Sequence, residues 1–148
     1  MSRDDPDRMP GTALRPSMAS RPPLTILFVD PDRPRSERLA DAVRATCVVG
    51  MAPSALIALD ALRQRLPDLI VTELDLPDMN GVEFISRVHN DPVMRHVLIM
   101  VVTNRTSVRD KIAALTAGAD DFLVRPITPE QFRLKTQLLG RFRRVLGR

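Results

Sequence analysis

Four polar side chains stand where apolar segments of this sequence end. Asp30 follows LTILFV, Glu73 follows DLIVT, Thr103 closes VLIMVVT and Arg125 follows DFLV. In α/β proteins, ligands and reactive groups gather at the carboxyl ends of the strands. A carboxylate at the point where a strand ends and the chain turns, as at Glu73, is a common position for such chemistry. The open question is whether Glu73 is reactive or stands where reactivity has been lost.

The elements that must position these side chains alternate along the chain. Asp32 is a plausible helix cap, and Pro34 suits the first turn that follows it. Strands whose side chains are apolar on both faces are typical of a parallel sheet with helices on both sides. Strands are predicted at LTILFV, CVVGMA, DLIVTE, VLIMVVT and DDFLVRP, with helices at 35–46, 54–66, 81–90, 107–117 and 128–146.

Length and composition favour one folded domain. The chain has 148 residues, 44% of them hydrophobic, which is enough for one core. Residues 1–23 hold five of the thirteen prolines and predict a disordered arm, so the domain is placed at 24–146. Cys47 is the only cysteine, which excludes a disulfide framework within the chain. Without an apolar run of about 20 residues or a signal peptide, we expect a cytoplasmic protein.

Two common nucleotide-binding motifs are missing. No G-x-G-x-x-G follows the first strand, and no G-x-x-x-x-G-K-[ST] occurs anywhere in the chain. The last 18 residues carry six basic side chains and no acid, whereas the rest of the chain sums to about minus two. A basic last helix can meet nucleic acid or an acidic partner, but it is more often a solvated face. With no Trp or Tyr for stacking, nucleic-acid binding is a minor alternative.

The segments ILFVDPD, PDLIVTELDLPDMNGVEFISRV, VLIMVVTN and AGADDFLVRPITPEQF resemble, in order and spacing, the receiver domain of bacterial two-component response regulators. The resemblance covers about residues 24–146. It implies a flavodoxin-like fold, and a strand-three aspartate that takes a phosphoryl group from a histidine kinase. It also implies two acids that help hold Mg²⁺ after strand one, a Thr or Ser after strand four, and a phosphate-contacting lysine after strand five.

This sequence departs from the family pattern at its reactive positions. Glu73 stands at the phosphoacceptor position, Pro31 replaces the second acid after strand one, and Arg125 replaces the lysine. Thr103 is kept, and Phe122 holds the position of the switch aromatic. Proline offers no side-chain oxygen, so the Mg²⁺ site is weakened and no cofactor is expected. The extra methylene of glutamate displaces the carboxylate by about 1 Å, which is enough to disfavour in-line transfer.

Several interpretations of this pocket remain open. Asp32 lies nearby as a second acid and is a minor candidate for a replacement metal ligand. We hypothesise that Arg125 and Glu73 form an internal ion pair in place of metal and phosphate, with Asp30 leaving the pocket at minus one. Glu73 then either mimics the phosphorylated state or marks an inactive pocket. Phosphorylation of Glu73 or of Asp75 is the alternative.

Without conventional phosphorylation, the function must reside in surfaces. The sequence then predicts a non-enzymatic signalling domain that acts through protein contacts with a histidine kinase, another regulator or an output protein. Lys111, Asp121 and Lys135 resemble charges that pair across a homodimer formed by the fourth helix, the fifth strand and the last helix. The last helix carries an apolar stripe, most of which is expected to cover the sheet: Phe132, Leu138, Leu139, Phe142, Val145 and Leu146.

Overall fold

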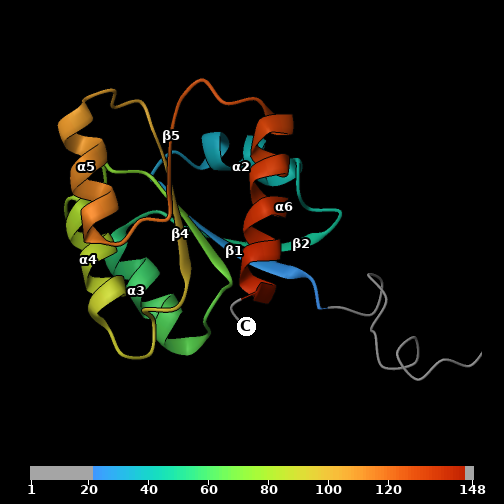
Figure 1. The fold of residues 1–148 in the computed structure, drawn as a ribbon, viewed down its shortest axis with the longest axis horizontal. Coiled ribbons are helices and arrows are strands. Elements are labelled where there is room, and N and C mark those ends of the chain that lie inside the picture. The colour runs from blue at the N-terminus through green and yellow to red at the C-terminus, as the bar shows by residue number, and fades with distance from the viewer. Residues whose placement is uncertain (1–21, 146–148) are drawn as a thin grey trace, which may run out of the picture.

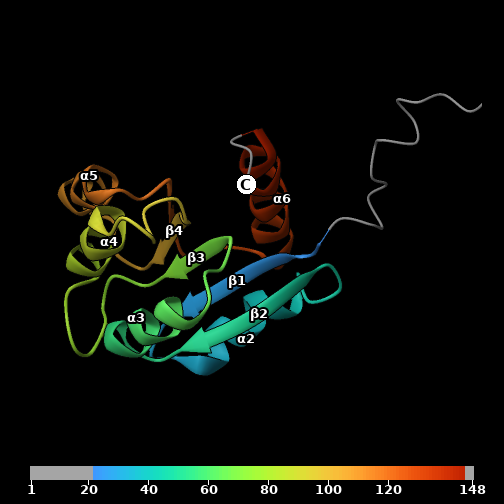
Figure 2. The same ribbon diagram turned by 90° about the horizontal axis from the view of Figure 1, so that it is seen from below.

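The computed structural model describes residues 22–145, and their side chains as far as residue 142. Its centre is a parallel sheet of five strands, as the sequence predicted. The strand order is β2-β1-β3-β4-β5. Figure 2 shows the neighbouring strands side by side. The strands are β1 (Leu24–Val29), β2 (Cys47–Ala52), β3 (Leu69–Thr72), β4 (Leu98–Thr103) and β5 (Asp121–Val124).

Helices cover both faces of the sheet. Figure 1 shows α3, α4 and α5 on one side and α2 and α6 on the other. All connections run from the carboxyl end of one parallel strand through a helix to the next strand, the arrangement that apolar strands buried on both faces require. The helices are α2 (Arg33–Asp41), α3 (Ala55–Gln64), α4 (Gly81–Asn90), α5 (Val108–Ala117) and α6 (Pro129–Val145).

Strand β1 separates two hydrophobic clusters through its alternating side chains. Leu27 and Val29 pack into the cluster beneath α3, α4 and α5. Ile26 and Phe28 face the opposite way, toward α2 and α6. The ring centroids of Phe28 and the fully buried Phe132 of α6 lie 5.7 Å apart. Successive strand residues point to opposite faces, so the uninterrupted apolar run of β1 serves both layers.

Two helices differ from the sequence prediction. Helix α2 ends at Asp41 instead of 46, because the N–H groups of Ala42 and Val43 bond three residues back and tighten the last turn. Helix α6 differs in the residues that face the sheet, which are Phe132, Thr136, Leu139 and Gly140.

The expectation that most of the α6 stripe covers the sheet is met by Phe132 and Leu139 but not by Leu138 and Phe142. Leu138 and Phe142 are 56% and 47% exposed. The side chains of Val145 and Leu146, like the predicted arm before residue 22, lie outside the described part of the chain. Within residues 22–145, no helix is both long and apolar enough to cross a bilayer.

Gly81 allows the loop after β3 to return close to its own beginning. Its N–H donates to the carbonyl of Leu74 at 2.9 Å. A Cβ at this position would lie 2.6 Å from the Leu74 Cα and 2.8 Å from the Glu73 carbonyl oxygen, which are both backbone atoms. The absence of a side chain at Gly81 therefore allows the backbone of Glu73 and Leu74 to lie this close.

We expect Gly81→Ala to lower the free energy of unfolding by about 2 kcal/mol, because backbone must move to admit the methyl group. Gly50→Ala is the matched control, since its Cβ meets only a Leu27 methyl at 3.6 Å. Urea denaturation measures both variants. Equal effects of the two substitutions would contradict the close approach at Gly81.

Candidate functional site

The sheet brings the four predicted side chains to one edge. Backbone hydrogen bonding continues one residue beyond the strands: the Glu73 N–H donates to the Val29 carbonyl at 2.9 Å, and the Arg125 N–H donates to the Thr103 carbonyl at 2.9 Å. Asp30, Glu73 and Thr103 are buried, and the side chain of Arg125 is 16% exposed. The common edge is a direct consequence of parallel strands.

Arg125 lies between the two buried carboxylates. Its Nη1 is 2.9 Å from Oε1 of Glu73, and its Nη2 is 3.3 Å from Oδ2 of Asp30. Nη2 also donates to the carbonyl of Val102 at 3.2 Å. The hypothesised ion pair between Arg125 and Glu73 is therefore present. The guanidinium is shared between two acids and does not chelate Glu73 with both of its arms.

A second guanidinium, which the sequence did not point to, completes the cluster. Arg35 of α2 donates two hydrogen bonds to Asp30, from Nε to Oδ2 at 2.9 Å and from Nη2 to Oδ1 at 2.7 Å. The same Nη2 lies 3.3 Å from Oε1 of Glu73. The hydrogen bonds from Arg35 to Asp30, with the nearby negative charge, raise the pKa of Arg35 despite partial burial. The expected net charge of minus one was therefore wrong, because Arg35 brings the cluster to zero.

The other oxygen of Glu73 is held by backbone. Oε2 accepts the N–H of Leu74 at 2.6 Å and that of Asp75 at 3.3 Å. Burial alone raises the pKa of the Glu73 carboxyl, but hydrogen bonds from Thr103, Arg125 and the Leu74 N–H outweigh burial. The pKa of Glu73 therefore lies below its ordinary value of 4.5. Glu73 is an ionised carboxylate with both oxygens engaged.

Asp32 caps α2, as the sequence predicted. Its side chain accepts the N–H of Arg35 at 3.1 Å and remains 47% exposed. Its own N–H donates to Oδ1 of Asp30 at 2.8 Å. The cap fixes the first turn of α2 and so aims Arg35 at Asp30.

The residues at this site do not fit Mg²⁺. The ion needs several oxygen ligands in near-octahedral geometry. Asp30 and Glu73 instead have oxygens bound to two guanidinium groups, and Pro31 supplies no side-chain ligand. Among the residues that the structure describes, no three His, Cys, Asp or Glu side chains form a group suited to a metal ion.

Asp75, the alternative acceptor, belongs to a different contact. Its carboxylate binds Nε of Arg105 at 3.0 Å, and Nη1 of Arg105 reaches Asp110 at 3.4 Å. The bond from Arg105 holds the pKa of Asp75 below its ordinary range. More than half of the Asp75 side chain is exposed, at 56%, so it lies outside the buried cluster.

The remaining predicted residues lie along β5 and its neighbours. Phe122 is buried in the cluster beneath α3, α4 and α5. Asp121 pairs within the chain with Lys135 of α6, with 3.1 Å between Oδ2 and Nζ. Lys111 is exposed on α5. The structure therefore shows one of the three proposed dimer charges neutralised by another within the same chain.

We expect Arg125→Met to lower the free energy of unfolding at neutral pH by about 2 to 3 kcal/mol, because two buried carboxylates keep only one guanidinium. Arg87→Met is the matched control: Arg87 pairs with Glu83 at 2.9 Å, but the two side chains are 53% and 52% exposed. Loss of that surface pair should cost less than about 1 kcal/mol. Denaturant titration compares the variants, and a loss no larger than that of the control would contradict the buried cluster.

The lowered pKa of Glu73 predicts a pH effect of definite sign. A depressed folded-state pKa contributes stability above the unfolded-state value, about 4.5, and loses it as pH falls through the folded-state value. The stability of the wild type relative to Glu73→Gln should therefore decrease below pH 4.5. Urea denaturation from neutral to acidic pH measures this difference. A difference that is constant or grows on acidification would show that Glu73 is not stabilised in its ionised form.

Comparison with known proteins identifies the family of this chain. The model of the response regulator receiver domain matches residues 26–137. In structure, the chain is similar to a putative response regulator from Chloroflexus aurantiacus, with a TM-score of 0.75 and 30% sequence identity. The alignment covers 80% of this chain and 98% of that one.

Curated relatives agree over the same part of the chain. Histidine kinase P4 of Formosa agariphila is 30% identical over 111 residues, which is 75% of this chain and 8% of that protein. DNA-binding response regulator MtrA of Mycobacterium tuberculosis is 34% identical over 123 residues, 80% of this chain and 50% of MtrA. The chain thus spans half or less of the length of these relatives. Because the family model covers the chain from within β1 to within α6, the chain belongs to the response regulator receiver domains of two-component signalling.

Proposed function

We propose that this receiver domain signals through protein contacts and does not use conventional aspartyl phosphorylation. The observation that carries the proposal is the neutral cluster of Asp30, Glu73, Arg35 and Arg125 at the phosphoacceptor position. Receiver domains interact with histidine kinases and with output domains. Loss of the phosphoryl step leaves those contact surfaces as the route of signalling.

The cluster opposes each requirement of phosphoryl transfer. An attacking carboxylate needs an oxygen free to approach phosphorus in line. Oε1 of Glu73 faces Arg125 at 2.9 Å and Arg35 at 3.3 Å, while Oε2 accepts a backbone N–H at 2.6 Å. The transfer also needs Mg²⁺ to neutralise charge. Two guanidinium groups already neutralise the acids that would hold the ion.

The contacts of Thr103 favour a pocket held in one state. Its hydroxyl is one of the groups that lower the pKa of the Glu73 carboxyl at the neighbouring strand end. The Thr103 oxygen also accepts the Arg105 N–H at 3.3 Å, which links β4 to the loop that follows it. We infer that Glu73 acts as a built-in partner for Thr103, and that the domain presents the same surface with or without a kinase.

We expect wild-type protein incubated with acetyl phosphate and Mg²⁺ to keep its unmodified mass. Glu73→Asp alone should also stay unmodified, because Pro31 and Arg35 still exclude the metal. A variant carrying Pro31→Asp, Arg35→Ser, Glu73→Asp and Arg125→Lys should gain one phosphoryl group, which would show that the fold is competent. Intact-mass spectrometry reads all three proteins.

Modification of the wild type would overturn the proposal. Peptide mapping would then assign the phosphoryl group to Glu73 or Asp75. Because carboxyl phosphates hydrolyse readily, the mass is recorded within minutes of mixing, and an ordinary phosphorylatable receiver domain serves as the positive control for the reagent.

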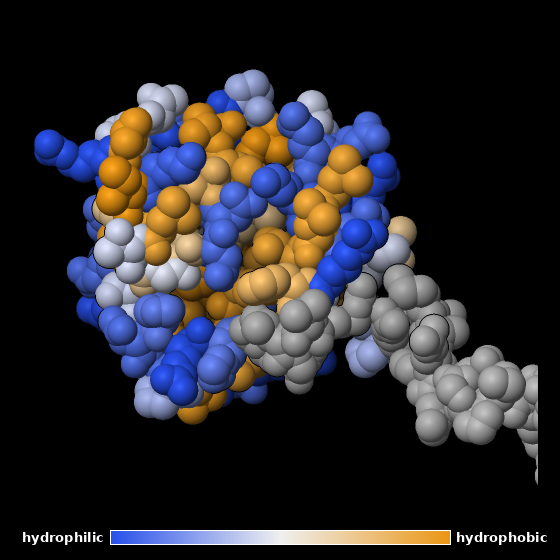
Figure 3. Space-filling model, in the orientation of Figure 1, coloured by the Kyte–Doolittle hydropathy of each residue, from blue (hydrophilic) through white to orange (hydrophobic). Residues whose placement is uncertain are grey.

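One side of the molecule has the composition of a contact surface. We define the α5–α6 face by its exposed apolar side chains. Figure 3 shows hydrophobic side chains gathered over α5 and over α6, with polar side chains between them. A patch of this kind with interspersed charges is typical of a protein interface. Its members are Val108, Ile112 and Leu115 of α5, Val124 of β5, and Leu134, Leu138 and Phe142 of α6.

We propose that the α5–α6 face forms a symmetric homodimer. Both copies would contribute the same apolar side chains, as two-fold symmetry requires. Lys111 is exposed on this face, and Asp121 pairs with Lys135 on the same side. In the dimer, Lys111 of one copy would approach the Asp121 and Lys135 pair of the other.

The double variant Ile112→Asp/Leu138→Asp should shift the chain from dimer to monomer, because each copy would bury two carboxylates in the interface. Leu56→Asp on α3 is the matched control, since Leu56 is 57% exposed and Ile112 is 58% exposed. Sedimentation velocity at several concentrations measures the association. A wild-type chain that stays monomeric at about 100 µM, well above ordinary dimer dissociation constants, would contradict the homodimer.

A further inference from the structure

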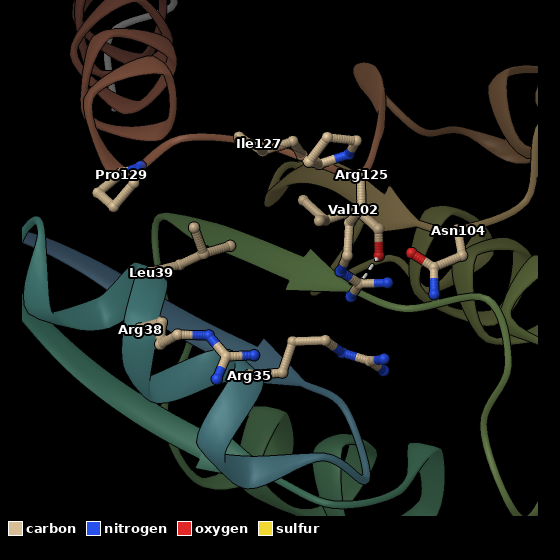
Figure 4. Close-up of a pocket in the computed structure, with 9 residues that line it drawn as sticks. Arg35, Arg38, Leu39, Val102, Asn104, Arg125, Ile127 and Pro129 are labelled. Atoms are coloured by element: carbon tan, nitrogen blue, oxygen red, sulfur yellow. Dashed lines mark hydrogen bonds between the residues drawn. The ribbon is translucent and has the colours of Figure 1, made fainter.

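A cavity of about 440 Å³ adjoins the buried charge cluster and shares Arg35 and Arg125 with it. Helix α2, the end of β4 and the connection from β5 to α6 form its walls, as Figure 4 shows. Its volume falls in the range of small-molecule sites in proteins. The lining consists of Arg35, Arg38, Leu39, Val102, Asn104, Arg125, Pro126, Ile127 and Pro129.

The charges that line this cavity are all positive. Arg35, Arg38 and Arg125 contribute three guanidinium groups, and no carboxylate belongs to the lining. Asp30 and Glu73 bind Arg35 and Arg125 from the other side. Arg38 differs from both, because within residues 22–142 no side-chain hydrogen bond or ion pair engages it. Figure 4 shows Arg38 and Arg35 extending from α2 in the same direction.

The unpaired guanidinium of Arg38 beside an apolar wall suits a ligand that has an anionic group and an apolar body. Its planar fork of N–H donors matches a carboxylate or a phosphate in two parallel bonds. The apolar wall is formed by the buried Leu39 and by Ile127, with two prolines of the connection to α6. Asn104 adds an exposed side-chain amide at the end of β4, on the side of Arg125.

We propose that this cavity binds a small organic anion, whose carboxylate or phosphate is held by Arg38 and whose apolar body packs on Leu39 and Ile127. Phosphate esters and carboxylic acids share this recognition chemistry. The inference goes beyond the proposed function, because it concerns a ligand bound through Arg38 and holds whether or not Glu73 accepts a phosphoryl group. A ligand here bridges α2 and the β5–α6 connection, and therefore gives the domain an input that needs no kinase.

The test uses 2-naphthoate and naphthyl phosphate as probes, with 2-naphthamide as the neutral counterpart. Chemical-shift titration of the ¹⁵N-labelled full chain reports both the affinity and the residues affected. We expect saturable shifts at Leu39, Asn104 and Ile127 with at least one anion. Removal of the charge in 2-naphthamide should weaken binding by about tenfold, as expected for the loss of a charge-assisted hydrogen bond.

Two variants locate the site and one controls for net charge. Arg38→Gln should weaken anion binding by about tenfold, and Ile127→Trp should abolish it by filling the apolar end. Arg109→Gln removes the same charge from exposed α5 and should change nothing. Equal binding by Arg38→Gln and wild type, or an absence of saturation by about 5 mM probe, would overturn the proposal. The two anions distinguish a carboxylate site from a phosphate site. Acetyl phosphate reactivity of the wild type is read separately by mass, so failure of the proposed function is not confused with failure of this one.

Discussion

Two carboxylates buried at the end of a parallel sheet must be neutralised where they stand. The structure meets this requirement with guanidinium groups from two directions, Arg35 from helix α2 and Arg125 from the end of β5. Because each arginine contacts both acids, the four side chains form one unit that joins β1, β3, β5 and α2. Buried charges are tolerated only when they are paired and hydrogen-bonded in this way. The position of the first helix and the end of three strands therefore depend on a single electrostatic balance.

Much of the fold was predictable because each layer repeats a simple pattern. Apolar strands alternating with helical segments gave the sheet, and parallel strands place their carboxyl ends together. Asp30, Glu73, Thr103 and Arg125 could thus be assigned to one site from the sequence. Asp32 was also correctly expected to cap α2, since a short acid before Pro34 suits a helix start.

The features that were missed depend on helix rotation and packing. Arg35 lies in the first turn of α2, where a charged side chain usually faces solvent, but here its backbone N–H binds the Asp32 cap and its guanidinium binds Asp30. A signal was present in its five-residue distance from Asp30, but charge alone does not give direction. In α6, the apolar residues outnumber the positions that can face the sheet. The sequence could not tell that Phe132 and Leu139 point inward while Leu138 and Phe142 do not.

The zero sum of the cluster has a consequence for how such a protein changes over evolutionary time. Replacement of any one of the four residues by a neutral one leaves a buried charge without its counterpart, and removal of one partner is the costly change for buried ions. Charge-conserving exchanges such as Glu73→Asp or Arg125→Lys keep the sum at zero, whereas a single neutral replacement does not. Neutral replacements within the cluster are therefore expected to be tolerated best in pairs, one acid together with one arginine. The four positions should in this sense vary as a set and not one at a time.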